Sequence, residues 1–537
     1  MNYNEFLHTK VQVAPVSGFS VRPEDIHPAL KPHQRDAVIW ACKGGRRALF
    51  ESFGLGKTVH ELEWCRLVQE HEQAPVIIVL PLGVRQEFAR DAVQLLGMDA
   101  PVYVRTMAEV RERPAKIYMT NYERVRDGDI DPTYFAGAAL DEASVLRSYG
   151  SKTFQTFMDL FRGVKYKLVA TATPSPNRYK ELIHYAGYLE VMDTGQALTR
   201  FFQRDSTKAN NLTLYPHKEE EFWLWVSSWA LFLSSPADLG YDAAGYDLPP
   251  LDVRTHKICS RIGDVVDKDG QVKMMNDVAV SLQDAAREKR ESVEARVAMA
   301  KQIVDSDPDA HFLLWHDLEY ERHEILRQIP GTVDIYGSMD YDERERRVID
   351  FSEGHTRLFA TKKSLSGSGC NFQRHCHRAI FVGIDYEFND FIQAIHRIYR
   401  FLQSEQVIID VIFTEAEEQI WRVLLEKWEN HNKLQAQMRD IVRQYGIEGG
   451  AAAEIYKRTI GGKRVEVKGN NFTAVNNDCV EEVSRMADNS VGLIHTSIPF
   501  SNHYEYTPSY NDFGHNATTL DFFKQMDYLT PELLRIL

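Results

Sequence analysis

The sequence contains few cysteines, and none are spaced like a redox pair. There are six in 537 residues, and no two form a Cys-x-x-Cys pair. This favours a reduced, cytoplasmic protein over a secreted disulfide scaffold. Cys370, His375, Cys376 and His377 lie close together in the sequence. A second ligand pair at structural-zinc spacing is missing, so we interpret these four as residues around a buried strand.

The chain also lacks a secretory leader, a membrane-spanning run and an excess of positive charge. Its first residues contain no cationic stretch followed by an apolar region, and no apolar run is long enough to cross a bilayer. The formal net charge is −14, which argues against a wholly basic nucleic-acid coat but leaves room for a local basic cleft. We expect a cytoplasmic protein without a membrane partner.

The composition that remains is typical of a large globular protein. Hydrophobic residues make up 44% of the chain and charged residues 26%, enough for several hydrophobic cores. The length predicts about three or four domains.

A phosphate-binding loop is predicted at residues 50–59. A strand-like apolar run enters a turn containing Gly54 and Gly56, and Lys57, Thr58 and a helix-like pattern follow. Glycines let backbone N–H groups face a polyphosphate, to which the helix N-terminus adds partial positive charge. Lys57 would reach the β- and γ-phosphates of ATP, and the Thr58 hydroxyl would bind Mg²⁺.

One residue departs from the generic loop. Glu51 stands where the first glycine is usual. Because short glycine turns recur by chance, the loop needs partners downstream. Upstream, Gln34 opens a helix-like segment; an ordinary surface glutamine is the default interpretation, and a contact with the adenine edge is the functional one.

The first of these partners is a pair of acids at 141–142. Asp141 and Glu142 follow the apolar run 138–140, where charge is costly unless a metal or water uses it. Asp141 would hold Mg²⁺ through its water shell, and Glu142 would orient and deprotonate the attacking water. A purely structural acidic strand end is the alternative.

Strand and helix patterns alternate through both halves of the chain, which predicts doubly wound sheets with sites at their carboxyl edges. In the second half, the small-residue loop 366–371 contains Gly369, which could approach a nucleotide closely. Arg397 and Arg400 are three apart, so they share one face of a helix. They are either a solvated surface or, as we favour, fingers that reach the γ-phosphate.

In this order, the motifs resemble those of superfamily-2 helicase-like ATPases, most closely the Swi/Snf-type double-stranded DNA translocases. The resemblance covers residues from about 28 to 430, and that family usually carries an acid at the position of Glu51. Two residues depart from it: Ser144 replaces a usual histidine, and His396 stands where an acid is common. The resemblance implies movement along duplex DNA without full strand separation.

The tail contains a second, shorter resemblance. Residues 488–500 resemble the opening of an amino-group DNA methyltransferase, whose Asp- or Ser-Pro-Pro-aromatic motif holds a flipped base. Ser497, Pro499 and Phe500 match it, and Ile498 departs from the usual first proline. The turn that binds S-adenosylmethionine in that family is missing, so we expect no independent methylation. Helicase–methylase fusions resemble phage proteins, which implies a bacterial host cell.

The expected fold class is α/β: two RecA-like doubly wound parallel-sheet lobes with a helical insertion, and a partial Rossmann-like fragment at the C-terminus. The aromatic stretch 222–232 of the insertion is interpreted as a packed helical core rather than a base-stacking surface. We predict these segments: an N-terminal extension (1–28), lobe 1 with the ATP site (29–195), a helical insertion or connector (196–295), lobe 2 (296–430), a helix and linker (431–462), and the methyltransferase fragment (463–537).

These observations predict a DNA-stimulated ATPase, an ATP-driven double-stranded DNA translocase coupled to an incomplete methyltransferase module. Its cofactors would be ATP and Mg²⁺, with S-adenosylmethionine only if the methyltransferase is completed. Two alternatives stay open: an ATP-gated DNA-binding scaffold that delivers a methylase, and a methyltransferase active only in a longer chain.

Overall fold

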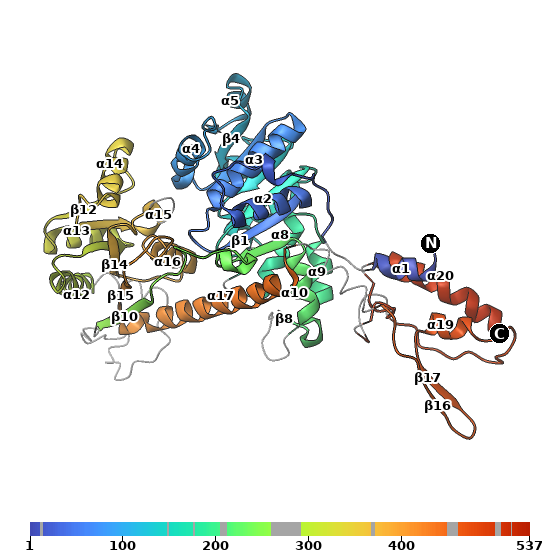
Figure 1. The fold of residues 1–537 in the computed structure, drawn as a ribbon. Coiled ribbons are helices and arrows are strands. Elements are labelled where there is room, and N and C mark those ends of the chain that lie inside the picture. Colours follow the sequence, from blue (N-terminus) through green and yellow to red (C-terminus); the bar gives the residue numbers. More distant parts are fainter. Residues whose placement is uncertain are drawn as a thin grey trace, which may run out of the picture.

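The computed structural model describes most of the chain, with short gaps. The described residues are all except 11–13, 148–149, 176–177, 205–211, 259–291, 367–370, 448–459, 500–505, 508 and 517. They form two large parallel sheets, each covered by helices, and a smaller unit that joins the two chain ends (Figure 1).

The first lobe is built on a seven-stranded sheet of order β3-β4-β2-β5-β6-β1-β9, in which every pair is parallel. Its strands are β1 (Arg46–Glu51), β2 (Val76–Leu80), β3 (Val102–Tyr103), β4 (Ile117–Asn121), β5 (Gly137–Leu140), β6 (Tyr166–Ala170) and β9 (Ala230–Leu233). Its helices are α2 (Pro32–Gly44), α3 (Lys57–Glu72), α4 (Arg85–Gln94), α5 (Met107–Glu112), α6 (Tyr122–Arg126), α7 (Lys152–Leu160), α8 (Leu182–Tyr188), α9 (Thr194–Phe201) and α10 (Glu219–Ser227). A small antiparallel pair, β7 (Phe202–Arg204) and β8 (Leu212–Leu214), lies beside them.

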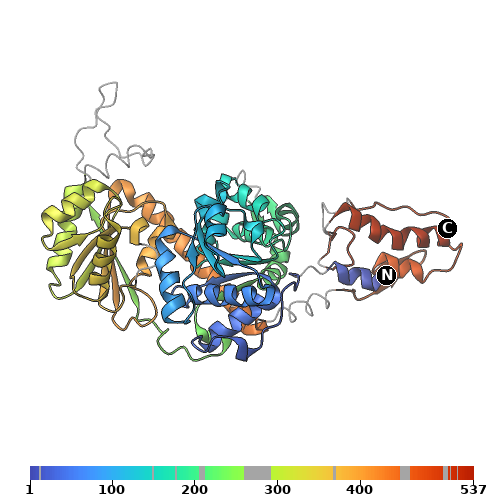
Figure 2. The same ribbon diagram turned by 90° about the horizontal axis from the view of Figure 1, so that it is seen from above.

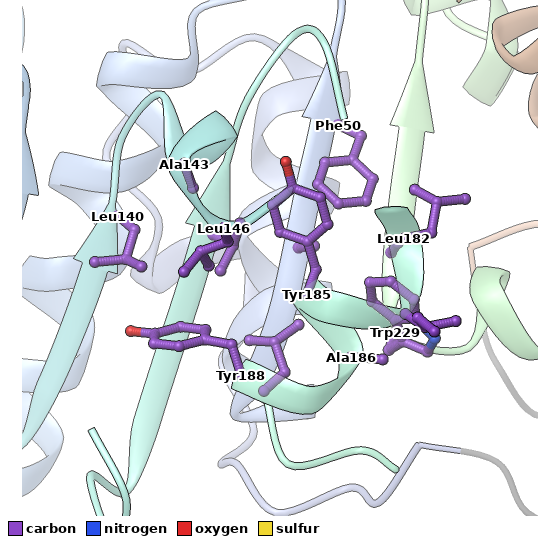
Figure 3. Packing of buried hydrophobic residues seen from close by; sticks show 14 of the residues in the cluster. Phe50, Leu140, Ala143, Leu146, Leu182, Tyr185, Ala186, Tyr188 and Trp229 are labelled. Carbon is purple, nitrogen blue, oxygen red and sulfur yellow. The ribbon is translucent and has the colours of Figure 1, made fainter. Parts of the chain in front are cut away.

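Both faces of this sheet are buried, as the continuous apolar strands require. Successive residues of a strand point to opposite faces, so Leu49 of β1 packs among α2, α3 and α4, whereas Phe50 packs among α8 and α10. Figure 3 shows the second of these cores, in which the Phe50 ring lies close to the rings of Tyr185 and Trp229.

The second lobe is built on a six-stranded sheet of order β10-β15-β14-β11-β13-β12, again with every pair parallel. Its strands are β10 (Leu251–Ile258), β11 (His311–His316), β12 (Thr332–Asp334), β13 (Leu358–Lys362), β14 (Cys376–Phe381) and β15 (Val407–Thr414). Its helices are α12 (Val293–Asp305), α13 (Glu319–Gln328), α14 (Tyr341–Ser352), α15 (Lys363–Ser366) and α16 (Phe388–Ile395). Two parallel α/β sheets with helices on their faces confirm the two RecA-like, doubly wound lobes.

One long helix, α17 (Glu418–Tyr445), runs from the second lobe to the first. At its start it packs on α16, and further along it packs on α10 and β9 (Figure 1). The helix predicted after residue 431 is therefore the second half of a single helix that contacts both lobes.

The segment 196–295 differs from the helical insertion that we expected, because it supplies a strand to each sheet. The aromatic helix α10 is followed directly by β9, which pairs with β1, and β10 pairs with β15. Trp223, Trp225 and Trp229 are buried in the first lobe, which confirms the packed core. A four-residue apolar run such as 230–233 carries no periodicity that separates a strand from a helix.

The C-terminal residues also differ from expectation. In the described part of 463–537, the one sheet is an antiparallel hairpin of β16 (Val465–Lys468) and β17 (Thr473–Asn476), not a parallel Rossmann-like sheet. Its strand residues are exposed except Val475, which is half-buried. Helices α19 (Cys479–Ser484) and α20 (Thr519–Ile536) complete the segment.

The N-terminal helix α1 (Tyr3–Thr9) packs on α20, so both chain ends belong to this small unit (Figure 2). The Tyr3 hydroxyl donates to the Asp478 carboxylate at 2.8 Å, and Lys10 Nζ donates to Gln525 Oε1 at 3.0 Å.

No helix among the described residues is long and apolar enough to span a membrane. The four cysteines in the described ranges, Cys42, Cys65, Cys376 and Cys479, are free thiols.

Candidate nucleotide site between the lobes

The carboxyl edge of the first sheet gathers the predicted motifs. Strands β5, β6 and β1 are neighbours. The predicted acids at 141–142 follow β5, the predicted glycine loop follows β1, and the turn 171–175 follows β6 between them. Parallel strands end at the same edge, which is where ligands bind in open α/β sheets.

The loop itself has the backbone that a phosphate cradle needs. Gly54 and Gly56 have φ angles of +88° and +94°, a region that side chains disfavour. Gly56 caps the N-terminus of α3, which begins at Lys57. A Cβ atom on Gly56 would lie 2.3 Å from Gln34 Nε2, so any other residue here requires the Gln34 side chain to move.

Lys57 is folded back over the loop. Its Nζ donates to the Glu51 carbonyl at 3.1 Å and lies 5.2 Å from the centre of the Phe53 ring. The ammonium thus lies over the loop, where Lys57 was predicted to meet the phosphates. Thr58 follows in the first turn of α3, half-buried like Lys57.

Glu51 anchors the loop through a buried contact with α3. Its side chain is fully buried, and its Oε2 lies 2.8 Å from Nδ1 of the equally buried His60. The residue that departs from the generic loop therefore joins the end of β1 to the second turn of α3.

Gln34 braces the loop from the side. Its Oε1 accepts from the Lys31 N–H at 2.9 Å, and its Nε2 donates to the Leu55 carbonyl at 2.8 Å. Both ends of the amide are engaged within the protein. The predicted adenine contact stays a prediction, and the second N–H and the second lone pair of the amide are the groups that would make it.

Asp141 and Glu142 meet Lys57 at the end of β5. Burial is the largest cause that raises the pKa of Asp141 to about 7; Glu142 raises it further, and Lys57 opposes both. Glu142 has a φ of +48°, a strained backbone for a non-glycine residue. Its Oε2 accepts from the Thr171 hydroxyl at 3.4 Å, so the end of β6 helps to aim it.

Sequence reasoning missed a third acid at this site. Glu61 is fully buried on α3, and its carboxyl lies beside Asp141. Burial first, and then Asp141, raise the pKa of Glu61 well above its usual value, while Lys57 opposes them. The available signal was spacing, because a residue four after Lys57 lies on the same helix face.

This donor set fits a hydrated Mg²⁺ ion. Three carboxyl groups lie near one ammonium group, and a divalent cation would balance the excess of acidic groups. No group of three or more His, Cys, Asp or Glu side chains is arranged to hold a metal ion within the described ranges. Thr58 and Asp141 are the ligands that the sequence predicts, and phosphate oxygens and water would complete the shell.

The two predicted arginines come from the second lobe. They lie just after α16, and Arg397 is 7% exposed. Arg400 Nη1 donates to Asn371 Oδ1. Burial raises the pKa of Glu87 on α4 of the first lobe, and Arg400 and Arg397 oppose this rise. A Cβ atom on Gly54 would lie 3.7 Å from Arg400 Cβ, so the arginine loop lies against the phosphate loop of the first lobe.

The remaining predicted residues fall elsewhere. Gly369 and Phe500 lie outside the described residues. Ser497 is exposed and Pro499 half-buried, in a stretch without regular secondary structure. The structure brings Lys57, Asp141 and Glu142 together and sets Arg397 and Arg400 near them.

Fold and site together define a protein of two RecA-like lobes with a glycine–lysine–threonine loop at the carboxyl edge of the first. No protein-family model matches the chain. Among solved structures, it is similar to a SWI2/SNF2 ATPase core from Sulfolobus solfataricus in complex with double-stranded DNA, at 18% identity and a TM-score of 0.37. The match covers 80% of this chain and 96% of that one. A likeness at this level leaves the function to be argued from the site.

Proposed function

We propose that the protein is a DNA-stimulated ATPase that uses ATP hydrolysis to move along double-stranded DNA. The observation that carries the proposal is the split site. Lys57, Asp141 and Glu142 lie at one sheet edge of the first lobe, and the loop of the second lobe that carries Arg397 and Arg400 lies against Gly54 of the phosphate loop. Phosphoryl transfer needs positive charge on both sides of the γ-phosphate.

Each residue has a role in that reaction. Thr58 and Asp141 would hold Mg²⁺, which neutralises charge on the phosphates. Glu142 orients the attacking water and accepts its proton, and Lys57 binds the β- and γ-phosphates. Arg397 and Arg400 stabilise the charge that develops on the γ-phosphoryl group as ADP departs. The products are ADP and inorganic phosphate.

Movement along DNA would come from closing and opening the lobes around this chemistry. The long helix α17 packs on both lobes. A change in the angle between the lobes would therefore be transmitted along this helix. Because the whole chain is acidic, at a net charge of −14, DNA must bind to a local basic surface rather than to the molecule at large.

The test is phosphate release with and without duplex DNA. We expect turnover that duplex DNA increases, and none for Lys57→Ala, with the fold intact by circular dichroism. Lys116→Ala is the matched control, since Lys116 is exposed and precedes β4 at the opposite edge of the same sheet. Wild-type turnover in Lys57→Ala would refute the assignment.

The methyltransferase-like tail is proposed as an accessory module without activity of its own in this chain. Incubation of the protein with labelled S-adenosylmethionine and DNA tests this, with no label transfer expected. Transfer of label to DNA would overturn it and favour a working methyltransferase.

A further inference from the structure

One loop of the second lobe, residues 396–402, is fastened to the first lobe at both ends. At its start, the His396 ring stacks on Phe53, with centroids 4.2 Å apart and planes 17° from parallel. Phe53 belongs to the phosphate loop of the first lobe, yet it packs against the hydrophobic core of the second. The same ring lies under the Lys57 ammonium, so one side chain joins the two halves of the site.

The far end of the loop is held by different contacts. The Phe401 ring lies 4.0 Å from Lys31 Nζ and 4.3 Å from the Tyr246 ring. The Leu402 N–H donates to the Gly245 carbonyl at 3.1 Å. Arg397 and Arg400 lie between these two attachments, so their backbone is fixed relative to the first lobe.

Between the attachments, the loop lies directly on the phosphate loop. A Cβ atom on Gly54 would lie 3.1 Å from the Phe401 backbone nitrogen. Each of the two glycines of the phosphate loop is therefore required by a different neighbour. Gly56 makes room for Gln34 of its own lobe, and Gly54 makes room for the backbone of the other lobe.

The His396 ring is suited to this stack because it is neutral and fixed. Nδ1 lies 2.7 Å from the Tyr399 carbonyl, so Nδ1 carries the proton and donates it. Removal from water is the largest cause that lowers the pKa of His396 to about 3. The Tyr399 carbonyl opposes it, and His431, Arg400 and Lys57 lower the pKa further. A neutral ring can lie flat on Phe53, whereas a carboxylate has no ring that could stack there.

We propose that Phe53 and His396 are positioning residues, whose stack sets Arg397 and Arg400 against the phosphate loop during ATP hydrolysis. The inference rests on the proposed ATPase function. It predicts that losing the stack lowers kcat while ATP binding by Lys57 and the glycine loop is retained. An aromatic pair of this kind corresponds to a loss of up to about tenfold in rate.

The experiment is a double-mutant cycle on DNA-stimulated ATPase activity. His396→Ala and Phe53→Ala should each lower kcat by up to about tenfold, and the double variant should be no slower than the slower single variant. The affinity for a non-hydrolysable ATP analogue should stay within about twofold of wild type in all three. His396→Phe keeps a neutral ring on Phe53 and should restore most of kcat, whereas His396→Asp should not.

The controls separate failure of this inference from failure of the proposed function. His355→Ala removes an exposed histidine of the same lobe and should leave kcat unchanged. An inactive wild-type protein would refute the ATPase proposal itself. An active wild type with additive losses in the cycle, or with His396→Phe as slow as His396→Ala, would refute the positioning role. Melting temperatures of the variants exclude loss of fold as the cause.

Discussion

The Gly56→Ala substitution tests the phosphate loop most closely, because two distinct costs can be worked out from the structure. The backbone at Gly56 has a φ of +94°, which costs an alanine roughly 1–2 kcal/mol. The new Cβ would lie 2.3 Å from Gln34 Nε2. The glutamine must then give up its bonds to Lys31 and Leu55, at about 1 kcal/mol each.

The sum is about 3 kcal/mol or more, which corresponds to a loss in ATP affinity of about a hundredfold or more if the loop distorts to relieve it. The assay is equilibrium binding of a fluorescent ATP analogue. Gly97→Ala is the matched control: it has a φ of +56° in the same lobe, but a Cβ there meets nothing within 4 Å. It should bind ATP like the wild type.

A second variant isolates the steric part of the effect. If the clash with the amide matters, Gly56→Ala should cost less affinity in a Gln34→Ala background than in the wild type. Wild-type affinity in Gly56→Ala, or an equal loss in both backgrounds, would refute this account of the loop.

Three further predictions follow from the same geometry. Arg397→Ala should lower DNA-stimulated ATPase activity by roughly 10³-fold or more while ATP binding persists; a rate near wild type would remove the finger role. Glu51→Ala should destabilise the protein by about 2 kcal/mol in denaturant unfolding, because it leaves a buried ring nitrogen of His60 without its hydrogen-bond partner. The control is Glu70→Ala, which breaks an exposed ion pair with Arg66 and should lower the free energy of unfolding by under about 1 kcal/mol. If Glu51→Ala and Glu70→Ala destabilised the protein equally, the anchoring role of Glu51 would be contradicted. Asp141 must lose its proton to bind Mg²⁺, and its pKa is raised to about 7, so Mg²⁺ affinity should rise with pH up to that value and level off above it. Calorimetric titration at pH 6 should give binding about tenfold weaker than at pH 8, and Asp141→Asn should abolish the pH dependence. For stability the sign is opposite: an acid whose folded pKa is raised stabilises the metal-free fold at low pH, and that contribution is lost as pH rises from about 4 to 7.

The parts of the site that could be predicted from sequence are those where local chain geometry sets the spacing. The sequence predicts a strand, a glycine turn and then a helix that begins at Gly-Lys-Thr. In the structure α3 begins at Lys57, so Lys57 and Thr58 lie in its first turn as predicted. The acids after β5 were also predictable, because a polar pair at the end of an apolar strand is costly without a purpose.

Other features depend on contacts between distant segments, which no local pattern contains. Spacing places Glu61 on the same helix face as Lys57, but only the fold shows that β5 brings Asp141 beside it. Phe53 looks like a loop aromatic until the second lobe places His396 on its ring. Likewise, the strand at 230–233 became recognisable only through its pairing with β1.

The central claim is that ATP hydrolysis at this split site is coupled to duplex DNA. The most direct measurement is the steady-state rate of phosphate release with duplex DNA, with single-stranded DNA and without DNA, each at low and moderate salt. The account predicts the highest rate with duplex DNA, and a stimulation that declines steeply as salt rises, since phosphate contacts dominate such binding. A rate that is the same with and without DNA at low salt would contradict it.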